Sequence, residues 1–563
     1  MARRMIMKRM KGYPLPFGVS EKDGVTNFSV AVESGKECIL KLYRKGNENP
    51  VFETELLEED AVGEVRFVAF PKEKVNGLEY CYEIDGESYI DPYVKSVVEK
   101  EGALVRGKIT EQSYDWEDDK TLEIPYHQVI AYSLHVRGFT KHSSSKVKKK
   151  GTFQGVIEKI PYLKELGINQ IQCMPVYGFL ESKKYKNYWG YGPAYCFAVK
   201  DAYAGMKSAD QELKDMVKAC HKEGIEVVLN LPFTSDTPKH IVVECLRYYV
   251  MEFHIDGFVL NPYNVALEHL KADPILKKTK LLHNKDDFQC IMRRFLKGDE
   301  AMVKGVMWWM RQRTEDTGSC NYITNHTGFT MMDLVSYDSK HNEDNGEHNQ
   351  DGPEINYSWN CGVEGPTRKK AILELRKQQI RNAFFLLLSS QGTPCILAGD
   401  EFGNTQKGNN NVYCQDNEIA WLNWKGLEKE RAIFEYVKSM IQLRKKYSFL
   451  HAAKPLLGAD YTSCGVPDIS FHGESAWQIP ENHASRQLGV YYHLEEGENT
   501  DYFIAYNMYW FERKFALPKL PKGKKWYRIY STADAILTEQ EVSEAEPKET
   551  IVDGRTIVMY VGR

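Results

Sequence analysis

The sequence predicts a multidomain α/β protein in which a closed (β/α)8 barrel lies between two antiparallel β-modules. Three observations predict it. The chain has 563 residues, more than one hydrophobic core usually organises. Both ends alternate apolar and polar residues in short runs, which is typical of half-buried antiparallel strands. The middle alternates continuous apolar runs with amphipathic stretches, which is typical of a parallel sheet covered by helices.

The first β-module is predicted over residues 12–120. Its alternating runs are separated by turns rich in Gly, Asn, Asp and Lys, and they include TNFSVAV, CILKLYR, EVRFVAF and EYCYEID. Such runs favour antiparallel pairing and a β-sandwich.

The barrel is predicted over residues 121–450. Strand-like apolar runs there include VIAYSLHV, INQIQCMPV, IEVVLNL and DGFVLN. The stretch TFQGVIEKIPYLKELGI has helical spacing, because its apolar residues fall on one stripe: Val156, Ile157, Ile160, Leu163 and Leu166. Strand and helix alternate over some three hundred residues, about the length of an eight-unit barrel.

The last module is predicted over residues 451–563. Short alternating runs return there, including GVYYH, DYFIAYNMYW, WYRIYS and TIVMYVG. They indicate a C-terminal antiparallel β-sandwich.

Composition restricts the possible partners. With 74 Lys+Arg against 78 Asp+Glu the net charge is -4, so charge gives no reason to expect nucleic acid or an anionic membrane as partner. The 12 cysteines are scattered singly without a CxxC pair, which favours reduced thiols in a cytoplasmic protein. The basic N-terminal stretch is followed by no apolar run long enough for a secretory signal or a membrane span.

Several long motifs in the middle of the chain resemble one family of enzymes. They are AYSLHVRGFTKHSS, GTFQGVIEKIPYLKELGINQIQCMPVYGF, NYWGYGPAYCFAVKDAYA, NYITNHTGFTMMDLVSYDSKHNEDNGEHNQDG, SWNCGVEGPT and GTPCILAGDEFGNTQKGNNNVYCQDNEIAWLNW. Together they are similar to glycoside hydrolase family 13, in its isoamylase and glycogen-debranching branch, over nearly the whole barrel. The resemblance implies an α-glucan ligand such as glycogen, starch or a maltooligosaccharide. It also implies that the N-terminal module is similar to a family 48 carbohydrate-binding module.

Retaining hydrolysis of an α-glucosidic bond needs a carboxylate nucleophile and a carboxylic acid about 5 Å apart. The family writes its nucleophile strand as Gly-Phe-Arg-Phe-Asp, and this chain has Gly-Phe-Val-Leu-Asn at residues 257–261. Asn261 therefore stands at the nucleophile position and Val259 at that of its arginine. An amide oxygen carries no negative charge to meet an oxocarbenium ion and has no titratable proton.

The other two acids of the family are also replaced. The stabilising aspartate follows a histidine in the family, whereas Thr327 follows His326 here. The general acid position aligns with Asn284, and no Glu lies between Glu268 and Glu300. The chain also reaches MRRFLKGD sooner than the family does, which indicates a deletion.

Four aspartates lie near the positions of the missing acids in the sequence. Asp286 and Asp287 are the best candidates for relocated acids. Asp236 also lies nearby in sequence, and Asp256 precedes a strand and is expected at the opposite end of the barrel.

Four residues are candidate sugar contacts. The resemblance places Trp189 and Tyr191 where the family stacks an aromatic ring on the sugar, and it places His326 at a sugar contact. A core aromatic ring and a structural histidine are the competing interpretations. His135 is a weaker candidate, with stabilisation of the barrel as the alternative. No metal or cofactor is expected, because DSKHNEDNGEHNQDG lacks the spacing of a calcium-binding loop.

The resulting hypothesis is a non-hydrolytic α-glucan-binding or regulatory homologue of the debranching enzymes. Two alternatives stay open. One is an active α-1,6-glucosidase or transglycosylase that uses relocated carboxylates. The other is an inactive subunit of an active isoamylase-type enzyme.

Overall fold

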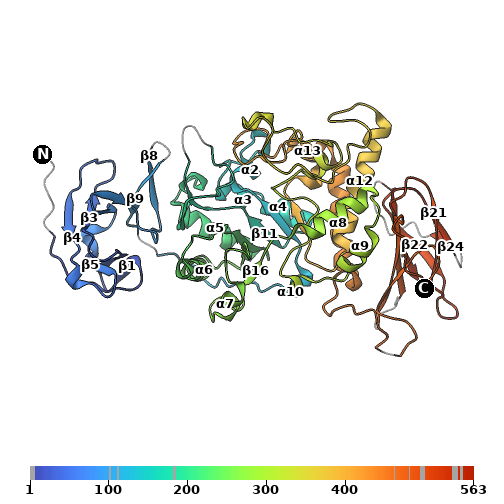
Figure 1. Ribbon diagram of the computed structural model, residues 1–563, viewed down its shortest axis with the longest axis horizontal. Helices are drawn as coiled ribbons and strands as arrows, with labels where there is room; N and C mark the ends of the chain where they lie inside the picture. Colours follow the sequence, from blue (N-terminus) through green and yellow to red (C-terminus); the bar gives the residue numbers. More distant parts are fainter. Residues whose placement is uncertain are drawn as a thin grey trace.

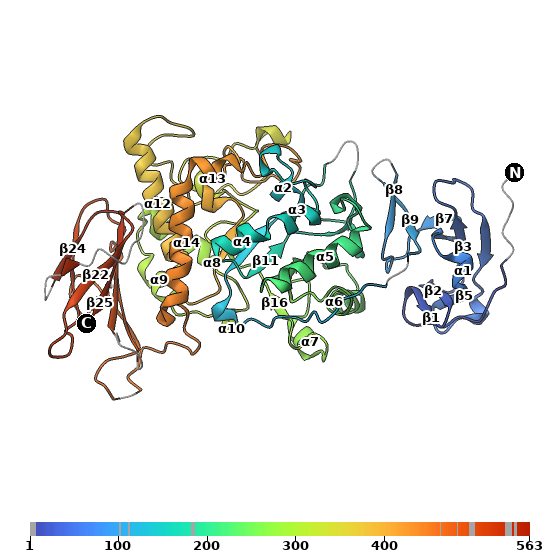
Figure 2. The ribbon, with the colours of Figure 1, turned by 180° about the vertical axis from the view of Figure 1, so that it is seen from behind.

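The computed structural model is elongated, with three groups of elements in a row along its long axis (Figure 1). N-terminal strands lie at one end, a parallel sheet with helices lies in the middle, and C-terminal strands lie at the other end. The view from behind shows the same order (Figure 2). The structure describes residues 7–100, 103–110, 113–181, 186–461, 463–480, 482–494, 501–534, 543–544 and 549–563.

The N-terminal module consists of two antiparallel sheets. One has the strand order β1-β2-β5 and the other β4-β3-β6-β9-β8, with β7 paired to β6. Phe28, Leu40 and Tyr82 are fully buried in one core that both sheets share, as the alternation of apolar residues predicts. The strands are β1 (Gly18–Lys22), β2 (Val25–Ala31), β3 (Cys38–Tyr43), β4 (Phe52–Glu55), β5 (Val65–Pro71), β6 (Glu79–Ile84), β7 (Glu87–Tyr89), β8 (Val97–Lys100) and β9 (Ala103–Lys108).

The central sheet is parallel, with the strand order β16-β15-β14-β11-β10-β17. Its strands are β10 (Ala131–Leu134), β11 (Gln170–Cys173), β14 (Glu226–Asn230), β15 (Gly257–Val259), β16 (Lys280–Leu282) and β17 (Cys395–Leu397). The two ends of this sheet meet through residues 319–321, because His283 pairs with Ser319 and Asn321 pairs with Pro394, both in parallel. The ring therefore closes through seven segments, where a standard barrel has eight.

The stretch between β16 and Ser319 accounts for the smaller ring. Every residue of this stretch is described, and it forms helices but no strand. The helices are α8 (Asp286–Lys297), α9 (Val303–Trp309) and α10 (Thr314–Thr317). The deletion indicated by the early MRRFLKGD motif thus coincides with the place where the ring has one strand fewer.

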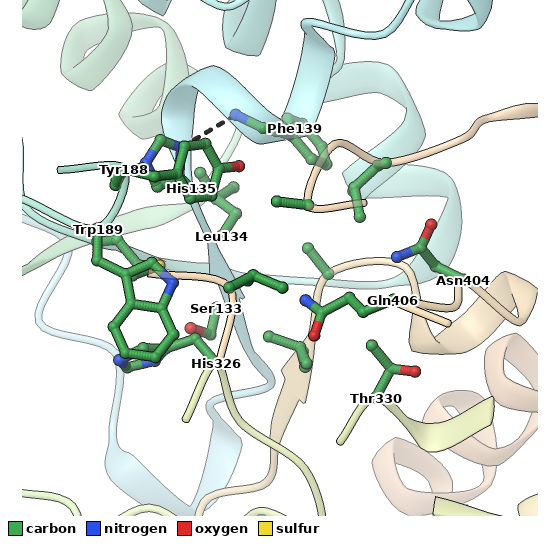
Figure 3. A pocket seen from close by; sticks show the side chains of 17 residues that line it. Ser133, Leu134, His135, Phe139, Tyr188, Trp189, His326, Thr330, Asn404 and Gln406 are labelled. Carbon is green, nitrogen blue, oxygen red and sulfur yellow. Dashed lines mark hydrogen bonds between the residues drawn. The ribbon is translucent and has the colours of Figure 1, made fainter. Parts of the chain in front are cut away.

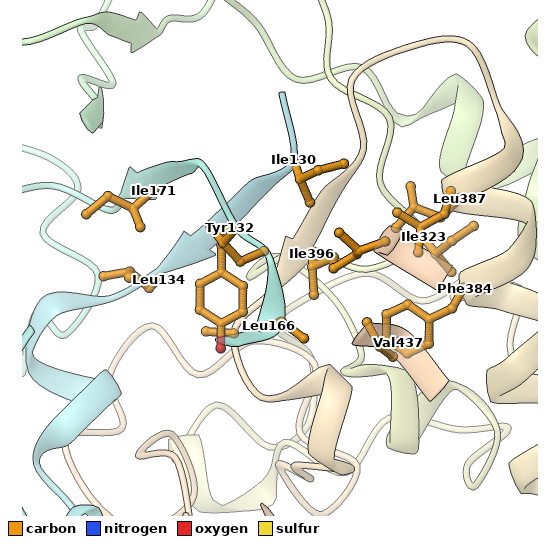
Figure 4. Packing of buried hydrophobic residues seen from close by; sticks show 14 of the residues in the cluster. Ile130, Tyr132, Leu134, Leu166, Ile171, Ile323, Phe384, Leu387, Ile396 and Val437 are labelled. Carbon is orange, nitrogen blue, oxygen red and sulfur yellow. The ribbon is translucent and has the colours of Figure 1, made fainter. Parts of the chain in front are cut away.

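Helices cover the outside of the ring, and β10 packs through Tyr132 and Leu134 into the large core between sheet and helices (Figure 4). The amphipathic stretch after β10 forms two helices instead of one, with a break at Lys159. Pro161 explains the break, because a proline ring clashes with the carbonyl four residues earlier. The helices are α2 (Val136–Thr140), α3 (Phe153–Glu158), α4 (Ile160–Leu166), α5 (Ala209–Lys222), α6 (Lys239–Phe253), α7 (Leu267–Ala272), α11 (Met331–Leu334), α12 (Lys370–Ser389), α13 (Lys425–Lys429) and α14 (Arg431–Lys446).

The amino ends of the strands are closed by a buried polar group. Glu226 at the start of β14 forms an ion pair with Lys280 and accepts a hydrogen bond of 2.8 Å from Gln170. Desolvation raises the pKa of Glu226, and the lysine partly offsets this effect. Asp256 lies at the same end, where it accepts a hydrogen bond of 2.7 Å from the Val227 amide. This is the end opposite to the predicted site, as expected for Asp256.

The C-terminal module contains a six-stranded sheet of order β18-β19-β20-β25-β22-β23 and a two-stranded sheet of β21 and β24. All of these pairs are antiparallel. The strands are β18 (Ile469–His472), β19 (Gln487–His493), β20 (Asp501–Asn507), β21 (Arg513–Ala516), β22 (Trp526–Ser531), β23 (Ser543–Glu544), β24 (Glu549–Val552) and β25 (Thr556–Gly562). Across the described chain, no helix is both long and apolar enough to cross a membrane.

Candidate functional site

The carboxyl ends of the parallel strands meet at one end of the barrel, which we call the mouth. Its polar residues include Asn230 at the end of β14, Asn261 after β15, Asn284 after β16 and Thr327 after the segment of residues 319–321. In barrels of this kind, the residues that follow the strands form the site.

Three side chains of the mouth form a hydrogen-bonded group around Tyr191. The Tyr191 hydroxyl is hydrogen-bonded to Nε2 of His326 at 2.6 Å and accepts from Nδ2 of Asn230 at 3.2 Å. Trp189 packs edge-on against His326, with ring centroids 5.1 Å apart. The structure thus brings together Trp189, Tyr191 and His326, all three of which were predicted as sugar contacts.

Burial fixes the protonation of this group. Desolvation lowers the pKa of His326 to about 4, so the ring is neutral near pH 7 and Nε2 can accept the tyrosine proton. Desolvation also raises the pKa of Tyr191, so its hydroxyl keeps its proton. The group is therefore uncharged at neutral pH, which suits an uncharged ligand.

His135 directly follows β10 and has a different set of partners. Its ring stacks on Tyr188 with centroids 4.0 Å apart, and Nε2 lies 2.6 Å from the Tyr188 carbonyl oxygen. Nδ1 accepts a hydrogen bond of 3.0 Å from the Gly138 amide and so caps α2. Desolvation lowers the pKa of His135 to about 4. Both ring nitrogens are used inside the protein, which fits the alternative that His135 stabilises the barrel.

A cavity of about 50 Å³ lies beside these residues (Figure 3). Trp189, His326 and Gln406 line it, and Trp189 Nε1 and Gln406 Oε1 have no hydrogen-bond partner within the described residues. A space of this size has room for water molecules and is far smaller than the ~300 Å³ at which ligand pockets begin. This cavity is therefore too small to hold a sugar ring.

The Asn261 side chain forms a hydrogen bond within its own loop. Its Oδ1 accepts a hydrogen bond of 3.0 Å from the Tyr263 amide, and its carbonyl oxygen accepts from the Asn264 amide at 3.1 Å. These bonds form a turn that asparagine favours. Asn261 itself is exposed to solvent.

Asn284 and Thr327, the other two residues aligned with the family's acids, are also exposed. The Thr327 hydroxyl donates to Asn325 Oδ1 at 3.0 Å, and its amide donates to the same oxygen at 3.2 Å. Asn284 lies two residues before α8. The side chains at these three positions can accept and donate hydrogen bonds, but none can supply a carboxylate.

The relocated-acid candidates both lie in the first turn of α8. Asp286 accepts a hydrogen bond of 2.7 Å from the Tyr322 hydroxyl, and Asp287 is exposed. They therefore stand on the same side of the mouth, whereas hydrolysis needs two carboxyl groups that flank the scissile bond. Within the described chain, no group of three or more His, Cys, Asp or Glu side chains is arranged to hold a metal ion.

Comparison with known proteins gives this geometry a context. The family model for the alpha amylase catalytic domain matches residues 135–263. Isoamylase 1 of Arabidopsis thaliana is 28% identical, with 93% of this chain and 85% of the relative covered. The glycogen operon protein GlgX homolog of Haemophilus influenzae is 31% identical, with 78% of this chain and 85% of the relative covered. The chain belongs to the alpha-amylase family, in its isoamylase and GlgX branch.

Solved structures support the fold of this isoamylase-type chain. A pullulanase of GBS has a TM-score of 0.77 at 16% identity, with 98% of this chain and 88% of that chain covered. The pullulanase of Paenibacillus barengoltzii has a TM-score of 0.74 at 18% identity, with 98% and 96% covered. The prediction of a multidomain barrel protein with flanking β-modules is confirmed, and so is the family resemblance.

Sequence reasoning about this isoamylase-type mouth missed one residue. Asn230 is the last residue of β14 and bonds to Tyr191, yet it was not predicted as part of the site. The signal was available, because a polar residue at the carboxyl end of a barrel strand is a site candidate by position alone. The contact itself was not predictable, because residues 191 and 230 belong to different strand–helix units.

Proposed function

We propose that this protein binds α-glucan without hydrolysing it. The observation that carries the proposal is the set of side chains at the three positions of the family's catalytic acids, which are Asn261, Asn284 and Thr327. An amide or a hydroxyl supplies neither the nucleophile nor the proton that glycoside hydrolysis requires. The neutral group around Tyr191 supplies what binding requires, namely aromatic surface and directed hydrogen bonds.

The class of ligand follows from the relatives. Curated relatives carry the names isoamylase and glycogen operon protein, and two of the similar pullulanases were solved with maltotetraose or maltohexaose. We take a linear or branched α-glucan as the ligand here. Binding would use the Tyr191 ring as a platform for one glucose unit.

The first experiment separates binding from turnover. Purified protein is incubated with amylopectin and with limit dextrin, and new reducing ends are counted. We expect none above the buffer control, because Asn261, Asn284 and Thr327 carry no carboxylate at the positions aligned with the family's acids. Turnover that disappears in Asp286→Asn or Asp287→Asn would instead establish the relocated-acid alternative.

The second experiment measures binding by co-sedimentation with insoluble amylopectin. We expect the wild type to sediment and Tyr191→Ala to lose at least tenfold in affinity. Tyr191→Phe keeps the ring but loses the hydroxyl, so an intermediate loss is expected. Tyr461→Ala is the matched control, because Tyr461 is exposed in the C-terminal part of the chain. A wild type that stays in the supernatant would sink the proposal and favour the partner-subunit alternative.

A further inference from the structure

We propose a second α-glucan-binding site, in a cleft between the N-terminal module and the barrel. This inference rests on the proposed function and adds a site outside the mouth. The cleft, called the junction cleft here, has a volume of about 640 Å³. Its principal lining residues come from four separate segments of the chain and are Tyr89, Tyr177, Tyr195, Phe233, Thr234 and Asp236.

Aromatic rings form the walls of the junction cleft. Tyr177 and Phe233 are buried, whereas Tyr89 and Tyr195 are half-buried and offer part of their surface to the cleft. Flat aromatic surfaces suit the apolar faces of sugar rings. The volume lies within the ~300–1,000 Å³ that is typical of ligand pockets. The junction cleft is therefore large enough to hold a sugar, whereas the small cavity is not.

The charge of the lining favours an uncharged ligand. Among the described residues that line the junction cleft there is no Lys, Arg or His, and Asp236 is its one carboxylate. A phosphate or carboxylate ligand would meet no cation and would be repelled by Asp236. The hydroxyls of Thr234 and Thr237 lie 3.3 Å from each other at the rim, where they and Asp236 can bond to sugar hydroxyls.

The junction cleft and the mouth share two chain segments. Tyr191 belongs to the mouth, and the residues that follow it, from Gly192 to Cys196, line the cleft. Asn230 bonds to Tyr191, and the residues that follow it, from Leu231 onward, line the opposite wall. The junction cleft is therefore built by residues that directly follow two residues of the mouth.

The two modules are packed firmly enough to give the junction cleft a fixed shape. Tyr93 of the N-terminal module lies against Phe197 of the barrel, with ring centroids 5.0 Å apart. Lys108 forms an ion pair with Asp201. Both figures show β8 and β9 as the part of the module that faces the barrel (Figure 1, Figure 2). A preformed cleft avoids the entropy of ordering on binding.

The test is isothermal titration calorimetry of the full chain with maltoheptaose, together with hydrogen exchange in its presence. Tyr195→Ala removes a wall of the junction cleft, and Ala194→Arg fills the cleft from β13 (Ala194–Val199). Tyr191→Ala removes the platform of the mouth, and Tyr461→Ala is the control. Thermal unfolding of each variant shows that the fold is kept.

We expect both cleft variants to lose at least tenfold in affinity at the junction cleft. Tyr191→Ala is expected to weaken binding at the mouth. Bound maltoheptaose is expected to slow exchange in residues 89–92 and 231–238 of the wild type, a readout that needs no variant. If affinity depends on Tyr191 alone and these residues are not protected from exchange, the proposed site in the junction cleft is overturned while the proposed function stands. If the cleft variants alone lose binding, the inference holds and the mouth is overturned. No binding at all overturns both.

Discussion

A single hydroxyl organises the mouth at the scale of residues. Tyr191 accepts a hydrogen bond from Asn230 and shares another with His326, so its hydroxyl is held from two segments of the barrel. The ring is then presented without the entropic cost of immobilising a mobile side chain when a ligand arrives. Neither neighbour needs a charge to do this.

The lowered pKa of His326 predicts a pH dependence of stability. In the unfolded chain the histidine pKa returns to about 6.5, so the unfolded state binds more protons between pH 6.5 and pH 4. Stability therefore falls as the pH decreases through this window, by up to about 1.4 kcal/mol per pH unit for each such histidine. His326→Gln keeps an acceptor for Tyr191 but cannot titrate.

Urea unfolding at pH 7, 6, 5 and 4.5 checks this prediction. The free energy of unfolding of the wild type should drop more steeply toward low pH than that of His326→Gln. Other buried groups, including His135, titrate in both proteins and cancel in the comparison. Parallel curves would show that the His326 pKa is not lowered by the fold.

Much of the residue-level site was predictable only through the resemblance. Trp189, Tyr191 and His326 come from segments far apart in the chain, and no local pattern predicts that they meet. The expectation that Asn261, Asn284 and Thr327 replace catalytic acids likewise depends on the family's motifs. The bonds of Asn230 and the use of His135 inside the barrel depend on packing between strand–helix units, which spacing does not encode.

At the scale of elements, the break between α3 and α4 was not predicted by the spacing of apolar residues. The stripe from Val156 to Leu166 predicted one helix, and its spacing holds across both α3 and α4. The break follows from Pro161, whose effect on the backbone is independent of the apolar pattern. α4 then ends at Gly167, which has a φ of 100° and lies against Ile441 of α14.

Replacing two helix-terminal glycines separates backbone strain from packing. A Cβ at Gly167 would lie 2.9 Å from Ile441 Cγ2, whereas at Gly224 it would meet nothing within 4 Å. Both residues have positive φ, so Gly224→Ala should cost about 1 kcal/mol of stability through the backbone alone. Gly167→Ala should cost clearly more, because α4 and α14 must also separate. Urea unfolding of both variants measures the difference, and equal losses would show that the Ile441 contact is relaxed without strain.

At the scale of the whole molecule, the chain is a shortened version of its relatives. The alignment with the Arabidopsis isoamylase 1 spans 675 residues, more than the 563 of this chain, so the relative has segments that this chain lacks. One shortening is visible between β16 and Ser319, where the ring has no strand. Alternating patterns predicted the three modules, but they could not predict how many strands close the ring, because closure depends on pairing between distant segments.

The smaller ring predicts that restoring the acids will not restore hydrolysis. Neighbouring strands lie about 4.8 Å apart, so one strand fewer moves the segment of Thr327 by about that distance toward β16. A misplacement of 1 Å can already cost about 100-fold in rate. The triple variant Asn261→Asp, Asn284→Glu, Thr327→Asp should therefore release no reducing ends from amylopectin. Measurable turnover by this variant would show that the seven-segment ring still supports the catalytic geometry.

The missing strand also sets the direction in which this lineage can change. A lost carboxylate can return through one codon, whereas a lost strand returns only through an insertion that keeps every other pairing in register. Under the proposed function, substitutions in the mouth change only how well the ligand is held, because a ring of seven segments separates the reacting positions by distances that no single substitution adjusts.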